Sequence, residues 1–105
     1  MHTANLFADS MPPPAGERLD VLLSHGNLVI ERIVSSARVV ATKYVQPQDE
    51  WVLLVRGEAE LDIVGEPVVL NAGDYVFLPS GTVHTLKSAS EGALWLAVHL
   101  HPFRS

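Results

Sequence analysis

From residue 28 onward, short apolar runs alternate with turn-forming residues. Between residues 58 and 63 acidic and apolar side chains alternate one by one, and this period of two indicates a strand with one face in a core and one in water. Glycine, proline, asparagine and aspartate separate the runs and favour tight turns. We expect strands over residues 39–45, 50–56, 58–63, 68–70, 75–78, 83–87 and 93–101. Many short strands joined by turns predict an all-β sandwich or barrel.

The first 27 residues predict an N-terminal arm followed by a short helix. Three consecutive prolines, residues 12–14, each remove an N–H donor and so favour an extended arm. Leu19, Leu22 and Leu23 then fall at helical spacing, and Gly26 is placed to end the last turn, so we expect a helix over residues 17–24. We therefore divide the chain into an arm with a helix, 1–27, and a barrel, 28–105, which together form one domain.

Composition and charge narrow the class of protein. A chain of 105 residues with 48% hydrophobic content suits one core. The net charge of −5 leaves no basic stripe for nucleic acid or for an anionic membrane surface. Because no apolar run reaches the roughly 20 residues that span a bilayer and no signal peptide is visible, we expect a cytoplasmic protein. The absence of cysteine limits any metal ligands to nitrogen and oxygen.

A single histidine ends the segment of residues 73–84, which reads turn, apolar strand, turn. Gly73 opens it, and Pro79 and Gly81 form the second turn before His84. The glycines at these turns are explained by backbone conformation alone. The imidazole of His84 is thus held at a fixed point of a β-scaffold.

A carboxylate opens the most apolar strand, which runs over residues 50–56 and is closed by Gly57. Burying Glu50 in a core costs several kcal/mol unless the carboxylate is paired or coordinated. His84 could form that pair, and the same two groups near a tyrosine in an apolar cavity are also what general acid–base catalysis requires. Both interpretations stay open.

These two segments resemble the two motifs of the cupin superfamily. In the second motif Gly73, Pro79, Gly81 and His84 match, while Ser88 stands where the family often has asparagine. The first motif is His-x-His, three or four residues, Glu, six residues and Gly. Its Glu50 and Gly57 match. The resemblance covers about residues 38–102 and implies a double-stranded β-helix, or jelly-roll, barrel.

Tyr44 and Gln46 stand where the family has its two first-motif histidines. In a cupin these four positions hold a divalent metal, so the resemblance implies a site built from Glu50, His84 and Gln46. A neutral amide and a protonated phenol are weak ligands. We therefore expect zinc, iron, manganese or nickel to bind at reduced affinity.

His99 is a candidate additional metal ligand on the last strand. If it points inward, Glu50, His84 and His99 make a carboxylate and two-imidazole set of the kind that binds iron or zinc. Strand alternation favours the opposite arrangement, with Leu96, Val98 and Leu100 inward and Trp95, Ala97, His99 and His101 outward.

Three functions of different classes follow. The first is an isomerase or lyase acting on a small polar metabolite such as a sugar acid, keto acid or hydroxy acid, with His84 as base, Glu50 as its partner and Tyr44 as proton donor. The second is a binding or sensing module without turnover, and the third is a structural dimeric cupin without activity. The resemblance also implies a homodimer, whose interface would use the arm and the outward face of the last strand.

Overall fold

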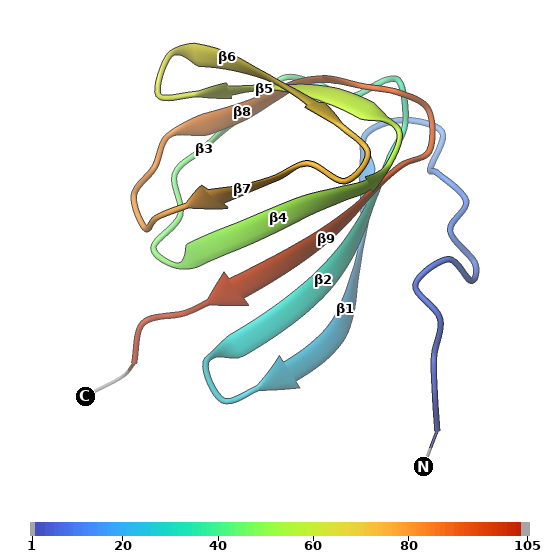
Figure 1. Cartoon of the computed structure of the whole chain (residues 1–105), viewed down its shortest axis with the longest axis vertical. Coiled ribbons are helices and arrows are strands. Elements are labelled where there is room, and N and C mark those ends of the chain that lie inside the picture. Colours follow the sequence, from blue (N-terminus) through green and yellow to red (C-terminus); the bar gives the residue numbers. More distant parts are fainter. Residues whose placement is uncertain (1, 104–105) are drawn as a thin grey trace.

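A computed structural model describes residues 2–103; Met1 of the predicted arm and residues 104–105 of the predicted barrel lie outside the described residues. Two antiparallel sheets pack face to face (Figure 1). The larger has the order β1-β2-β9-β4-β7 and the smaller the order β3-β8-β5-β6. The strands are β1 (Glu17–His25), β2 (Leu28–Ser35), β3 (Lys43–Tyr44), β4 (Asp49–Arg56), β5 (Glu58–Ile63), β6 (Glu66–Asn71), β7 (Tyr75–Leu78), β8 (His84–Ala89) and β9 (Ala93–Leu100). The predicted all-β jelly roll is confirmed.

The helix predicted over residues 17–24 is wrong. These residues form β1, which pairs antiparallel with β2 from Glu17 opposite Ser35 to His25 opposite Leu28. Gly26, expected to end a helix, instead lies in the tight β1–β2 turn with a φ of +59°. Hydrogen bonding to β2 outweighs the weak helical spacing of three leucines, because isolated short helices are marginal in water. Residues 17–25 thus belong to the sheet rather than to the arm.

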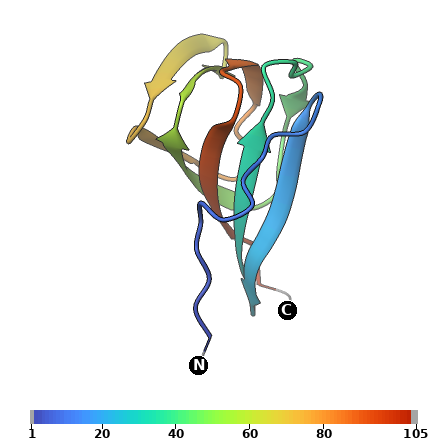
Figure 2. The same ribbon diagram turned by 90° about the vertical axis from the view of Figure 1, so that its right-hand side faces the viewer.

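The segment before β1 lies across the outer side of the larger sheet, as the blue trace in Figure 2 shows. Arg32 on β2 holds it there. Its guanidinium donates to the carbonyls of Leu6, Ala8 and Asp9, at 3.0, 2.6 and 3.3 Å. It also pairs with the Asp20 carboxylate at 2.8 Å. Arg32 is buried, so this set of contacts fixes the arm against the sheet.

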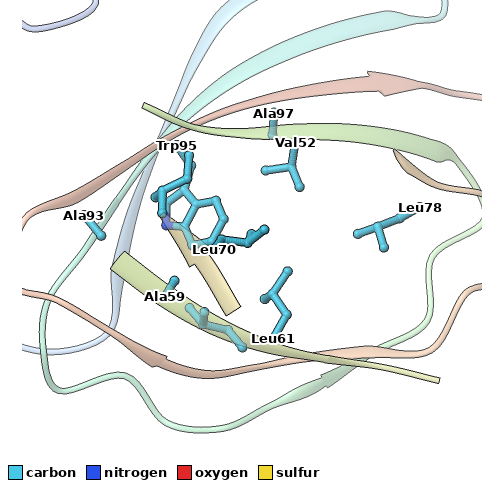
Figure 3. Close-up of a cluster of buried hydrophobic side chains, with 10 residues drawn as sticks. Val52, Ala59, Leu61, Leu70, Leu78, Ala93, Trp95 and Ala97 are labelled. Carbon is cyan, nitrogen blue, oxygen red and sulfur yellow. The ribbon is translucent and has the colours of Figure 1, made fainter. Parts of the chain in front are cut away.

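The core lies between the two sheets (Figure 3). Trp95, Val52 and Leu78 come from the larger sheet and meet Leu61 and Leu70 of the smaller one. The Trp95 indole N–H donates to the Ser35 hydroxyl at 3.1 Å, which meets the requirement that a buried polar group be paired.

Among residues 2–103, no helix is long and apolar enough to cross a membrane.

Candidate functional site

A cavity of about 140 Å³ opens between the sheets next to this core. It is lined by Glu17, Leu19, Glu31, Ile33, Tyr44, Gln46, Glu50, Val52, Leu61, Leu78, His84, Leu86, Trp95 and His99. All five side chains predicted from the sequence as catalytic or metal-binding are in this set: Tyr44, Gln46, Glu50, His84 and His99.

Glu50 lies at the centre of the polar groups. It occupies the second position of β4, directly opposite His99 on β9 and Leu78 on β7. One carboxylate oxygen is 3.9 Å from His84 Nε2 and the other is 3.9 Å from His99 Nε2. At these distances the three groups interact electrostatically without direct hydrogen bonds.

Burial raises the pKa of Glu50 above the ordinary value of 4.5, since the charged form loses hydration. His99 and His84 act in the opposite direction by stabilising the anion, and Glu31 raises the pKa further. A carboxyl group with a raised pKa beside two imidazoles is suited to general acid–base chemistry, with a water or a substrate bridging the separations of 3.9 Å.

His84 is the first residue of β8, and a hydrogen bond from its Nδ1 atom holds the ring in place. Nδ1 donates to the Thr82 carbonyl at 3.1 Å, which directs Nε2 toward Glu50 and leaves it the lone pair of the neutral ring. Tyr44 faces His84 directly across the β3–β8 ladder. The two rings stack with centroids 5.7 Å apart, so the phenol and the imidazole share one wall of the cavity.

His99 points into the barrel, so the outward orientation favoured from strand alternation is wrong. Trp95, Ala97 and His99 are buried, whereas Leu100 is 47% exposed. Both faces of β9 carry apolar residues, so the sequence pattern did not decide between them. The packing of Trp95 decides which face is inward, because its indole fills the space between the sheets. Every second residue after it, including His99, then lies on the same inward face.

Two cavity carboxylates, Glu17 and Glu31, were missed from the sequence. Glu31 Oε1 lies 2.6 Å from His99 Nε2. Glu17 accepts a hydrogen bond of 2.8 Å from Ser35, and burial raises its pKa, with that hydrogen bond acting against the rise. A signal existed, because Glu31 interrupts the apolar residues of β2. Glu17 was missed because it was placed in the incorrectly predicted helix over residues 17–24 and not in a strand.

The comparisons with known proteins agree with this architecture. The model of the cupin domain matches residues 33–99. The chain belongs to the cupin family. A family match of this breadth establishes the fold and leaves the activity open, because one barrel carries many chemistries.

Several solved cupin-like structures resemble the chain along most of its length. A protein of Ralstonia eutropha JMP134, named as a proposed mannose-6-phosphate isomerase, shares 36% identity at a TM-score of 0.86 and covers 97% of this chain and 100% of that one. KdgF from Halomonas sp. shares 21% identity at a TM-score of 0.76, covering 86% of this chain and 82% of that one. TT1209 from Thermus thermophilus shares 19% identity at a TM-score of 0.84, covering 97% and 100%. The last two likenesses concern the fold alone.

One curated relative matches part of the chain. An uncharacterized protein of Aquifex aeolicus (strain VF5) is 34% identical over 55 residues, which are 52% of this chain and 46% of that protein. The chain therefore spans less than half the length of this relative.

The residues of this cupin do not form a ready-made metal centre. Within residues 2–103, no three His, Asp or Glu side chains are arranged to hold a metal ion. The first-motif positions offer only the Tyr44 phenol and the Gln46 amide, which are weak ligands. The expected weak metal site remains a prediction.

Proposed function

We propose that this cupin binds a small polar metabolite in the barrel cavity and catalyses proton transfer on it, as an isomerase or lyase does. The observation that carries the proposal is the convergence of Glu50 and His84, 3.9 Å apart, on the cavity wall that also carries Tyr44. A structural core would be expected to fill these positions with aliphatic side chains, since burying a carboxylate is costly. Similarity to a proposed isomerase at 36% identity supports the same reaction class.

In the proposed mechanism His84 Nε2 is the general base. Its Nδ1–H donates to the Thr82 carbonyl, which keeps the lone pair of the neutral ring directed at the cavity. Glu50 stabilises the imidazolium that forms when the base takes a proton. The Tyr44 hydroxyl then donates to the oxygen on which negative charge develops. Every step uses side chains that line the cavity.

Solvent-deuterium exchange tests this function. A panel of carbonyl and hydroxy metabolites is incubated with the protein in D2O, and proton NMR detects deuterium in the substrate carbon positions. We expect exchange with the unmodified chain and a loss of at least about 100-fold with His84→Gln, the usual size of a general-base contribution. His25→Gln is the matched control, because His25 is exposed in the β1–β2 hairpin. Equal exchange by both variants would contradict the assignment.

A binding module without turnover is the second candidate. The open, largely apolar cavity supports it equally well, since pockets with a few polar groups are typical ligand sites. It is distinguished by a ligand that raises the melting temperature while no deuterium exchange and no product are detected.

We also propose that the chain forms a homodimer through the β1 edge of the larger sheet. β1 is an outermost strand, and its Val21, Leu22 and Leu23 are exposed. Unpaired strand edges with apolar side chains favour pairing with another chain. Leu19 lines the cavity and is 57% exposed, so a second copy on this edge would also cover the cavity rim.

A further inference from the structure

The cavity is rich in carboxylates and has no strongly basic side chain. Glu17, Glu31 and Glu50 contribute three carboxylates, and among the described residues neither lysine nor arginine lines the cavity. His84 and His99 are the only side chains of this lining that can become positive. The three carboxyl groups outnumber the two imidazoles, and a bound cation would favour the ionised forms of Glu17 and Glu50, whose pKa is raised by burial.

Two buried polar atoms in the cavity lack a hydrogen-bond partner among the described residues, one donor and one acceptor. The donor is His99 Nε2: the Gln48 amide donates to His99 Nδ1 at 3.3 Å, so the ring hydrogen is on Nε2, which has no hydrogen-bond partner within residues 2–103. Glu31 Oε1 lies 2.6 Å from this nitrogen, outside hydrogen-bond geometry. The buried Gln46 Oε1 also has no partner in that part of the chain, and an amide oxygen can only accept.

Two aromatic rings complete the lining. Tyr44 and Trp95 both contact the cavity, and aromatic faces attract cations. The volume of about 140 Å³ is close to the roughly 150 Å³ that holds benzene in an engineered cavity. The enclosed part of a ligand is therefore about six non-hydrogen atoms.

We propose that this cavity selects a small organic ammonium compound and rejects carboxylated and phosphorylated ones. An ammonium group brings one positive charge and three N–H donors, which match the carboxylates and the one unsatisfied acceptor, Gln46 Oε1. A phosphate monoester would bring about two negative charges and only acceptor oxygens at neutral pH. The inference rests on the proposed function, because it names the ligand class of the same cavity.

The ligand class so assigned differs from that of the similar Ralstonia protein, whose name implies a phosphorylated sugar. It also excludes the acidic metabolites expected from the sequence. A divalent metal ion would satisfy the same charge. We favour the ammonium because no three of the described His, Asp or Glu side chains are arranged as metal ligands.

The test uses three probes of nearly equal size and different charge: 3-amino-1-propanol, 1,3-propanediol and 3-hydroxypropanoate. The protein is first dialysed against EDTA, and binding is measured by calorimetry and thermal shift at neutral pH. A second panel of larger amines, neutral polyols, acids and sugar phosphates is screened in the same way. We expect the amines to bind at least tenfold more tightly than their neutral partners, and the anions not to bind.

Glu31→Gln provides the matched variant, because it removes one charge while keeping the size of the side chain. It should weaken amine binding at least tenfold and weaken diol binding much less, because the amide keeps an acceptor oxygen but not the charge. Glu66→Gln, which changes an exposed residue on β6, should alter neither. Glu17→Gln is measured in parallel, and far-UV circular dichroism verifies that each variant is folded.

The outcomes distinguish the ammonium assignment from the proposed metabolite-binding function on which it rests. Saturable binding of anions but not amines would overturn the ammonium assignment while the metabolite-binding function stands. Binding of anions only after Zn²⁺ is restored would overturn it too, because the cation would then be the metal. Failure of every charge class to bind would overturn both proposals. Amine binding unaffected by both Glu31→Gln and Glu17→Gln would show that the carboxylates do not select the ligand.

Discussion

Glu50 and His99 face each other directly across the β4–β9 ladder, and both point into the cavity. Their side chains approach to 3.9 Å. His84 reaches the other oxygen of the same carboxylate from β8, in the opposite sheet. One buried acid therefore interacts with two imidazoles, one from each sheet.

Replacing Glu17 should make the stability of the protein less sensitive to a rise in pH above about 4.5. Burial raises the pKa of Glu17 above 4.5, so the unfolded chain releases this proton before the folded one does. The contribution of Glu17 to the free energy of unfolding is fully present at pH values below its pKa in the unfolded chain. It is lost as the pH rises through its pKa in the folded protein. Glu17→Gln stays neutral at every pH and can still accept a hydrogen bond from Ser35. The variant should therefore equal the parent chain in stability below the unfolded pKa of Glu17 and exceed it above the folded pKa.

Urea unfolding at a series of pH values measures this difference. The exposed Glu66→Gln is the control and should follow the parent chain. A constant difference between Glu17→Gln and the parent at every pH would contradict the linkage.

Restoring the two first-motif histidines should create a strong metal site. Tyr44 and Gln46 both line the cavity with Glu50 and His84, so Tyr44→His with Gln46→His would supply two imidazoles in place of a phenol and an amide. We expect zinc affinity to rise at least about tenfold, since each added imidazole is a good ligand. Competition with a chromophoric chelator measures the affinity.

The matched control is Tyr44→Phe with Gln46→Leu, which adds no ligand. Elemental analysis of untagged protein and of His84→Ala gives the metal content of the natural site. Equal zinc affinity in the double-histidine variant and the parent would refute the placement of these two side chains.

Removing the Arg32 guanidinium should detach the N-terminal arm. Arg32 is buried and pairs with Asp20 as well as with three arm carbonyls. Arg32→Ala should lower the free energy of unfolding by about 2–4 kcal/mol, because buried charged partners lose their hydrogen bonds. Urea unfolding measures the loss, and limited proteolysis should cut the arm first.

Arg18→Ala is the comparison for that experiment. Arg18 is about one third exposed and makes longer contacts with Asp9 and Asp20, at 3.4 and 3.3 Å. Exposed pairs contribute at most about 1 kcal/mol. Equal losses in the two variants would mean that Arg32 has no special role in holding the arm.

Gly57 is required where β4 turns into β5. Its φ is +93°, and an added Cβ would lie 2.5 Å from the Ser90 hydroxyl, which accepts from the Glu58 N–H. Gly57→Ala should cost about 2–4 kcal/mol, from the unfavourable backbone and from overpacking together. Gly65→Ala separates the two causes, because Gly65 has a φ of +82° with open space around it. Similar losses at both positions, measured in urea, would exclude the Ser90 contact as a cause.

The proposed dimer predicts a light-scattering mass of two 11.4 kDa chains at micromolar concentration. Leu23→Glu on the β1 edge should shift the mass toward one chain, because a charge in an apolar interface is poorly solvated. Val69→Glu, at an exposed position of the other sheet, should leave the mass unchanged. A monomer mass for the parent chain over this range would refute the interface.

The sequence was sufficient for the fold class and for most of the residues of the candidate site. Turn residues at short intervals marked the strands, and the spacing around Glu50 and His84 marked the two cupin motifs. It misassigned residues 17–25, because three leucines at helical spacing gave no sign of the β2 strand with which they pair. β2 follows β1 directly through the tight turn at Gly26, so the error lay in interpreting this glycine as a helix end, and strand pairing overrode the local helical spacing.

What the sequence alone determined was the chemistry available: one acid heading an apolar strand, one histidine after a fixed turn, and the loss of the first-motif histidine pair. Only the tertiary structure decided which further groups join them. β9 is apolar on both faces, so the packing of Trp95 between the sheets was needed to turn His99 inward. Pairing of β1 with β2 and of β2 with β9 then brought Glu17 and Glu31 into the same cavity, because neighbours across a sheet are set by register and not by distance along the chain.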